Sequence, residues 1–169
     1  MARAPPRWRR GDPGERRRAA EPDARRRLAL NVYADTSLLV AIITPDAFST
    51  RAKDFIESDR PTLLISDFAA AEFASALARR VRTRELTKGQ AQEAFATFDG
   101  WAAYRGTRLE VTSFDVTRAE TFLRRLDFAL RTPDALHIAI AQRHDAALAT
   151  FDAQMATAAR TLGLEVAAA

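Results

Sequence analysis

The sequence of 169 residues predicts an α/β domain, a three-layer α/β/α sandwich with a central parallel sheet. The alternation of two kinds of segment predicts this class. From Leu28 onward, short runs of aliphatic and β-branched residues alternate with longer segments whose apolar residues recur at helical spacing. Strands that are separated by helices are typical of parallel sheets, in which helices cover both faces. We expect about five short strands and about seven helices.

Residues 1–27 differ from the rest of the chain in composition. They contain ten arginines and four acids, a balance of +6, whereas residues 28–169 come to −2. They also contain four of the seven prolines and no apolar periodicity. We therefore expect a disordered Arg/Pro-rich tail at 1–27 and one folded domain at 28–169. A nucleic-acid-binding arm and an extension without its own function are both open readings of the tail.

The first half of the domain begins with a strand that ends in an acid. Val32 and Tyr33 favour a strand, and Asp35 stands where this apolar run stops. Pro61 leads into a second strand, and Thr87 has the side chain of a helix N-cap. The elements expected here are a strand at 29–34, helices at 37–43 and 47–58, a strand at 62–66, and a helical hairpin of 67–84 and 87–104.

The second half continues the alternation of strands and helices. Thr132 and Pro133 are suited to the N-cap and first turn of a helix, and Gly163 to a helix C-terminus. The elements expected here are a strand at 107–114, a helix at 115–130, a helix that begins at 132, a strand at 146–152, a helix at 153–162 and a strand at 164–166.

Composition excludes several classes of protein. The chain has no cysteine, which rules out disulfides and thiolate metal sites and is compatible with a reducing compartment. The longest apolar run, 38–43, is far shorter than the roughly 20 residues of a membrane span. We therefore expect a cytoplasmic protein without a membrane segment. The sequence also lacks a P-loop, a GxGxxG fingerprint and a GxSxG elbow, so nucleotide-fuelled, dinucleotide-dependent and serine-hydrolase activities have no support.

Four acids are expected at one edge of the sheet. Asp35 and Asp152 each follow a strand, while Glu72 and Asp134 lie in the first two turns of helices. Helices that return antiparallel to a parallel sheet start at its carboxyl edge, where ligands of open α/β sheets bind. Each acid alone has a structural explanation, as a helix cap or as a charge that favours the positive helix end. Convergence of all four favours a functional site.

A cluster of carboxylates predicts a cation. Acids brought together raise one another's pKa unless a cation lies among them, and an oxygen-only cluster suits Mg²⁺ or Mn²⁺. Such ions activate water and offset charge on a phosphate that undergoes in-line displacement. The chemistry predicted from the residues is phosphodiester hydrolysis.

Four segments also carry a family resemblance. They read YADTSLLVA at 33–41, SDFAAAEFASALARRV at 66–81, RTPDALHIAIA at 131–141 and LATFDAQMATAARTLGLEV at 148–166. In this order and spacing the chain resembles the PIN-domain ribonucleases, in particular the VapC-type toxins of bacterial toxin–antitoxin modules. The tail at 1–27 has no counterpart in the family pattern.

The resemblance implies a PIN-like fold and a Mg²⁺- or Mn²⁺-dependent endoribonuclease. The family's acidic quartet matches Asp35, Glu72, Asp134 and Asp152, and its polar supporting positions match Thr36, Ser37 and Thr150. It further implies a homodimer and a small VapB-like antitoxin whose C-terminal segment wraps the toxin and blocks the site.

Alternatives remain open at the sequence level. A haloacid-dehalogenase-type phosphatase needs a second acid two residues after Asp35, where this chain has Ser37, and a non-catalytic PIN-like nucleic-acid-binding module is a third reading. His137 is interpreted as a structural histidine, with a supporting role at the site or contact with RNA as alternatives. Asp115 is interpreted as a helix cap rather than a fifth acid. Arginines near the end of the long helix suit either the helix dipole or RNA phosphates, namely Arg79, Arg80, Arg82 and Arg84.

Overall fold

The computed structural model describes residues 31–59 and 61–167, and the predicted tail at 1–27 lies outside them. Strands and helices alternate along the described chain as expected. In order they are β1 (Asn31–Ala34), α1 (Thr36–Ile43), α2 (Ser49–Asp59), β2 (Thr62–Ser66), α3 (Asp67–Arg82), α4 (Lys88–Arg105), β3 (Gly106–Leu109), α5 (Ser113–Leu123), α6 (Thr132–Arg143), β4 (Ala147–Ala149), α7 (Ala153–Thr161) and β5 (Val166–Ala167).

The five strands form one parallel sheet in the order β3-β2-β1-β4-β5. The chain builds outward from β1 to β2 and β3, then crosses back to place β4 on the other side of β1. The order of the strands therefore reverses between β1 and β4. In open α/β sheets, this switch point is where a crevice opens at the carboxyl ends of the strands.

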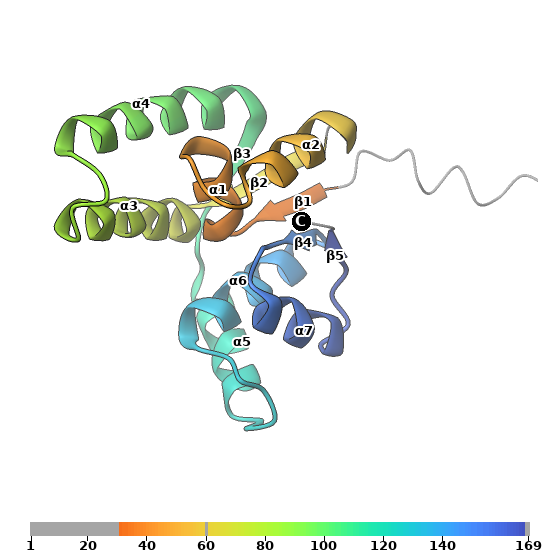
Figure 1. Cartoon of the computed structure of the whole chain (residues 1–169). Helices are drawn as coiled ribbons and strands as arrows, with labels where there is room; N and C mark the ends of the chain where they lie inside the picture. The colour runs from red at the N-terminus through yellow and green to blue at the C-terminus, as the bar shows by residue number, and fades with distance from the viewer. Residues whose placement is uncertain (1–30, 60, 168–169) are drawn as a thin grey trace, which may run out of the picture.

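Helices cover both faces of the sheet, so the three-layer prediction is confirmed. The side chains of β1 alternate, with Val32 and Ala34 in the core under α1 to α4 and Tyr33 in the core under α5 to α7. Leu63 and Leu64 of β2 divide between the two cores in the same way. Figure 1 shows α1 to α4 on one side of the sheet and α5 to α7 on the other, with α3 and α4 as the predicted hairpin. No helix among the described residues combines the length and apolar character that a membrane crossing needs.

The main differences from the predicted boundaries lie around α5. The expected strand at 107–114 ends at Leu109, and the helix expected at 115–130 runs from Ser113 to Leu123. Thr112 is the N-cap, and its Oγ1 accepts a hydrogen bond from Asp115 N, while the Asp115 carboxylate accepts from Thr112 N. This capping box starts the helix earlier than the apolar pattern suggests. Leu126 has a φ of 60°, a left-handed conformation that does not continue a helix.

The start of one other helix and the bounds of two strands differ by small amounts. Helix α6 has Arg131 rather than Thr132 as its N-cap, because the Asp134 carboxylate accepts a hydrogen bond from Arg131 N. The strand expected at 146–152 is limited to Ala147–Ala149, and the last strand begins at Val166 rather than at 164. Gly163 has a φ of 80° just after α7, as predicted for a glycine at a helix C-terminus.

Candidate active site

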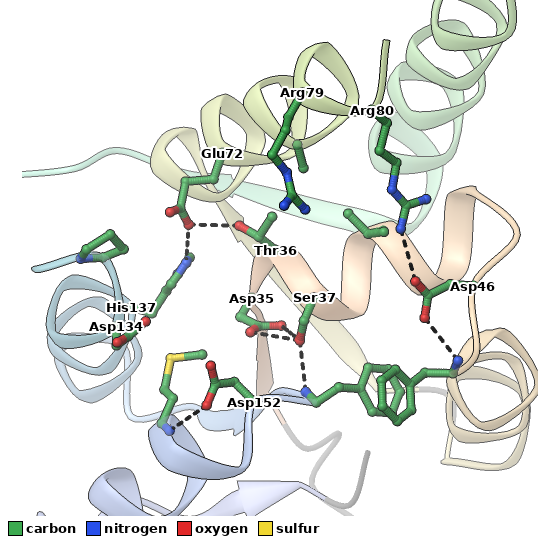
Figure 2. A pocket seen from close by; sticks show the side chains of 16 residues that line it. Asp35, Thr36, Ser37, Asp46, Glu72, Arg79, Arg80, Asp134, His137 and Asp152 are labelled. Carbon is green, nitrogen blue, oxygen red and sulfur yellow. Dashed lines mark hydrogen bonds and ion pairs between the residues drawn. The ribbon is translucent and has the colours of Figure 1, made fainter. Parts of the chain in front are cut away.

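A cleft opens at the carboxyl edge of the sheet, at the switch point between β1 and β4. Its volume is about 440 Å³, and its lining includes all four predicted acids, Asp35, Glu72, Asp134 and Asp152. The acids come from the end of β1, from α3, from the start of α6 and from the end of β4. Figure 2 shows their side chains around one opening. The predicted convergence of the four acids on one rim is therefore what the structure shows.

Asp35 lies at the floor of the cleft and is only 2% exposed. It is the N-cap of α1, where Oδ1 accepts a hydrogen bond from Leu38 N at 2.9 Å. Ser37 Oγ donates to both carboxylate oxygens at 2.8 and 2.9 Å, and Thr150 Oγ1 donates to Oδ2 at 2.7 Å. Burial raises the pKa of Asp35, although the nearby His137 and these hydrogen bonds oppose the rise. The residue is a helix cap and a cleft carboxylate at once.

Ser37 and Thr150 join the ends of two neighbouring strands around Asp35. Ser37 Oγ accepts a hydrogen bond from Phe151 N at 2.8 Å, and Thr150 Oγ1 accepts one from Asp152 N at 2.9 Å. Both hydroxyls thus donate to the Asp35 carboxylate and accept from the backbone that follows β4. Two of the three predicted supporting residues, Ser37 and Thr150, therefore connect the β1 and β4 ends of the site.

Glu72 is held on the opposite wall by two side chains from other elements. Its Oε2 accepts a hydrogen bond from Thr36 Oγ1 at 2.9 Å and lies 2.6 Å from His137 Nε2. Burial raises the pKa of Glu72, but the contact with His137 and the bond from Thr36 lower it by more, so the net shift is downward. An ionised carboxylate only accepts hydrogen bonds, so Nε2 of His137 carries a proton and donates it to this bond.

His137 is 2% exposed, and both of its ring nitrogens have partners. Besides Glu72, its Nδ1 lies 2.8 Å from the hydroxyl of Tyr33, which lies 2.6 Å from Ser66 Oγ. Ser66 in turn accepts from Ala69 N as the N-cap of α3. His137 is thus a structural histidine that also positions a site carboxylate, and it contributes to the lining of the cleft.

The roles of Tyr33 and Ser66 in this chain of hydrogen bonds were not predicted from the sequence. The available signal was Tyr33 itself, an aromatic hydroxyl in the middle of a strand that is buried on both faces, because a buried tyrosine hydroxyl usually has a hydrogen-bond partner. Burial raises the pKa of Tyr33, so the hydroxyl keeps its proton. With one proton, it donates to one neighbour and accepts from the other.

We expect Tyr33→Phe to lower the free energy of unfolding by about 1–3 kcal/mol, because it leaves His137 Nδ1 buried without its partner. Urea denaturation measures the change. The matched control is Tyr104→Phe, which removes the same hydroxyl from a side chain that is 86% exposed and should leave stability unchanged. Equal stability of the two variants would contradict this role for the Tyr33 hydroxyl.

Asp134 and Asp152 are each anchored by one carboxylate oxygen. Asp134 Oδ2 accepts from Arg131 N at 2.9 Å. Asp152 is the N-cap of α7, and its Oδ1 accepts from Gln154 N at 2.8 Å and from Met155 N at 2.9 Å. The helix-cap explanation therefore holds for Asp152 as it does for Asp35, and both residues still line the cleft.

Three of the four acids keep one carboxylate oxygen free of hydrogen bonds from the described residues. Within the described residues, Glu72 Oε1, Asp134 Oδ1 and Asp152 Oδ2 have no hydrogen-bond partner. Asp35 differs, because Ser37, Leu38 and Thr150 make four contacts with its carboxylate, two on each oxygen. The donors that remain are hard oxygens, which are the ligands that Mg²⁺ and Mn²⁺ prefer. No three histidine or acidic side chains of the described chain form a ready-made metal shell.

The lining of the cleft also includes an aromatic pair that the sequence did not indicate. Phe48 and Phe151 stack with ring centroids 4.5 Å apart and an interplanar angle of 11°. The guanidinium carbon of Arg51 lies 5.9 Å from the Phe48 centroid and 5.5 Å from the Phe151 centroid. The contacts among these three side chains connect the loop before α2 to the loop that carries Asp152.

Asp115 is not part of the cleft. It is fully buried at the start of α5, where its two carboxylate oxygens accept from Arg143 Nε and Nη2 at 2.7 and 3.0 Å. The interpretation of Asp115 as a residue of the helix start is therefore right, and the structure adds an ion pair to α6. His144, the C-cap of α6, has a buried Nε2 without a partner among the described residues. Burial and the charge of Arg143 lower the pKa of His144, so the charged form of this histidine is disfavoured at the helix end.

Comparison with known proteins identifies the family. The family model of the PIN domain matches residues 32–161, which span most of the chain and all four acids. The chain belongs to the PIN domain family. Its five-stranded parallel sheet and seven described helices are the PIN-like fold that the resemblance implied. A search of curated protein sequences finds no match.

Solved structures with the same fold include bacterial toxins. VapC20 of Mycobacterium tuberculosis, described as a toxin that cleaves the sarcin-ricin loop, is 22% identical with a TM-score of 0.62, over 75% of this chain and 94% of that one. VapBC2 of Rickettsia felis, bound to a DNA fragment from its promoter, is 16% identical with a TM-score of 0.59, over 82% and 98%. FitAcB of Neisseria gonorrhoeae is 16% identical with a TM-score of 0.56, over 80% and 95%. At these identities the likeness establishes the fold of this PIN domain.

Proposed function

We propose that this PIN domain protein is the toxin of a toxin–antitoxin module and acts as a Mg²⁺- or Mn²⁺-dependent endoribonuclease. The observation that carries the proposal is the cleft at the β1–β4 switch point, where carboxylates from four separate elements meet. Among the similar structures, one is described as a toxin that cleaves the sarcin-ricin loop and another as a toxin–antitoxin complex. The substrate proposed for this chain is RNA.

The carboxylates fit a divalent metal ion by their donor chemistry. Asp35, Glu72, Asp134 and Asp152 are proposed to hold the ion, one or two of them directly and the others through waters. Mg²⁺ needs no closed shell of protein ligands, because it keeps several waters and is bound by one or two carboxylates. When bound, such an ion activates water and neutralises charge on the phosphate.

The residues around the acids are proposed to keep this arrangement in place before the substrate arrives. Ser37 and Thr150 orient the Asp35 carboxylate, and Thr36 and His137 orient that of Glu72. Fixed orientation matters because metal sites lose about 10- to 100-fold in affinity or activity when such supporting partners are removed.

The proposed partner besides RNA is a small VapB-like antitoxin whose C-terminal segment occupies the cleft. The similar structures of VapBC2 and of a Klebsiella pneumoniae toxin–antitoxin complex support this class of partner. A homodimer is proposed from the family resemblance. The phosphatase alternative lacks its second acid, because the position two residues after Asp35 is Ser37, whose hydroxyl donates to the Asp35 carboxylate.

We expect the purified protein to cleave RNA in Mg²⁺ or Mn²⁺ and to stop in EDTA. The oxygen of water forms the new bond to phosphorus, the bond from phosphorus to the 3′ oxygen breaks, and that oxygen takes up a proton. The products should therefore carry 5′-phosphate and 3′-hydroxyl ends, which end-specific labelling identifies. Cyclic 2′,3′-phosphate ends or full activity in EDTA would contradict the proposed chemistry, and metal-dependent RNA binding without cleavage would favour a non-catalytic binding module.

A further inference from the structure

One face of α3 lines the cleft beyond Glu72. Residues 72, 76, 79 and 80 all contribute to the lining, at the i, i+4, i+7 and i+8 spacing that places side chains on one side of a helix. This face carries the Glu72 carboxylate at one end and two arginines about two turns further on. The cleft therefore has a basic portion next to its acidic centre.

Arg80 is engaged in a structural role. Its Nη2 lies 3.1 Å from Asp46 Oδ2, and its Nη1 donates to Thr44 Oγ1 at 3.0 Å. The side chains of the ion pair are only 18% and 21% exposed. These contacts fasten α3 to the loop between α1 and α2, and they neutralise the charge of Arg80.

Arg79 differs from Arg80 in having no counter-charge among the described residues. Its guanidinium points into the cleft in Figure 2, yet within the described residues it forms no side-chain hydrogen bond and no ion pair. An exposed arginine carries five N–H donors in a planar fork that matches the oxygens of a phosphate. The cleft thus presents an unused phosphate-binding group on the wall that also holds Glu72.

The helix dipole does not explain the direction of Arg79. Arg79, Arg80 and Arg82 all lie in the last turn of α3, where the negative helix end favours cations. That effect is the same for all three, whereas only Arg79 and Arg80 line the cleft and Arg82 does not. The sequence left two interpretations of these arginines open, the helix dipole and contact with RNA phosphates. The rotation of α3, which directs Arg79 into the cleft, favours the second interpretation for Arg79.

We propose that Arg79 binds a backbone phosphate of the RNA next to the one that is cleaved. The inference rests on the proposed function and adds a substrate-binding residue outside the acidic quartet. Arg79 lies seven residues, or roughly 10 Å of helix axis, from Glu72. That separation assigns it to a neighbouring phosphate of the strand, while the four acids surround the reacting one.

The test compares Arg79→Ala with Arg82→Ala, which removes the same charge from the same turn of the same helix outside the cleft. Binding of a short, fluorescently labelled single-stranded RNA is measured by anisotropy in EDTA, so that no cleavage occurs, at several salt concentrations. We expect Arg79→Ala to weaken binding about tenfold, as for the loss of one charge-assisted hydrogen-bonding group. The slope of log K against log salt should fall by about 0.7, the value for one phosphate on a single strand. Arg82→Ala should match the parent protein in both measurements.

Arg79→Lys separates charge from shape. It should restore the salt slope but only part of the affinity, because lysine lacks the planar fork. Thermal melts should show that all three variants fold like the parent. If the parent cleaves RNA and Arg79→Ala binds it like Arg82→Ala, the role of Arg79 is wrong while the proposed function stands. A weaker affinity with an unchanged salt slope would also overturn the phosphate contact, and a parent that neither binds nor cleaves RNA would overturn both proposals.

Discussion

Asp35→Asn should lower the rate of RNA cleavage by more than about 100-fold. Removing a residue that only orients a metal ligand costs a site up to about 100-fold, and Asp35 is proposed to act at the metal site itself. The folded protein should nevertheless remain within about 1 kcal/mol of the parent in stability, because asparagine is as good an N-cap as aspartate. The amide oxygen can still accept from Leu38 N, and a neutral amide costs less to bury than a carboxylate whose pKa burial has raised. Cleavage assays beside urea denaturation measure the two effects.

Thermal melts with and without metal test whether Asp35 contributes to binding of the ion. Mg²⁺ or Mn²⁺ should raise the melting temperature of the parent by mass action, since the folded cleft binds the ion and the unfolded chain hardly does. The rise should shrink or vanish in Asp35→Asn and in Asp134→Asn. The matched control, Asp99→Asn, removes the same charge from an exposed position of α4 and should keep both cleavage and the metal-dependent rise. If Asp35→Asn unfolds the protein, its capping role dominates and the catalytic assignment loses its support.

Arg143→Met should lower the free energy of unfolding at pH 7 by about 3 kcal/mol. The substitution leaves the fully buried Asp115 carboxylate without its cation, and breaking a buried pair in this way costs about 3–5 kcal/mol. The Arg143 side chain is 25% exposed, so we expect the lower end of that range. Urea denaturation of the variant beside Arg82→Met, an exposed arginine of α3, measures the effect.

The loss of stability in Arg143→Met should become smaller as the pH falls. Burial raises the pKa of Asp115, but the bonds from Arg143 and Thr112 lower it by more, so its pKa in the folded protein lies below the unfolded value of about 3.9. The stability that this carboxylate contributes is therefore complete above that value and is lost as pH falls through the lower folded pKa. In Arg143→Met, burial still raises the pKa of Asp115, but the arginine no longer lowers it. The difference between parent and variant should thus narrow between pH 7 and about pH 4, whereas a constant difference would assign the loss to packing of the arginine stem.

Local pattern was sufficient for the fold class and for the placement of the acids. The apolar periodicities predicted five strands and seven helices, because a strand or helix reveals its buried side within a few residues. The carboxyl-edge rule then placed Asp35 and Asp152 after strands and Glu72 and Asp134 near helix starts. All four line one cleft in the structure. Their roles as metal-binding and catalytic residues stay predictions.

Two of the boundaries that were wrong are helix starts, where a side chain rather than the apolar pattern decides the first residue. Helix α5 begins at Ser113 because Thr112 and Asp115 form a capping box, and α6 begins after Arg131 because Asp134 accepts from its N–H. Such hydrogen bonds stabilise a helix start by about 0.5–2 kcal/mol. That is enough to move a boundary by one or two residues without changing the periodicity that predicts the element.

The sequence by itself determined the family, the layers and the edge at which the acids meet, since these follow from patterns that are local in the chain. Only the tertiary structure decided which side chains support the acids and which arginine enters the cleft. Glu72 and His137 are 65 residues apart, and Tyr33 joins His137 to Ser66 across three elements. Arg79 and Arg82 are equivalent in the sequence, but the rotation of α3 against the sheet directs Arg79 alone of the two into the cleft. Contacts of this kind depend on how three layers pack, and no periodicity within a single segment encodes that packing.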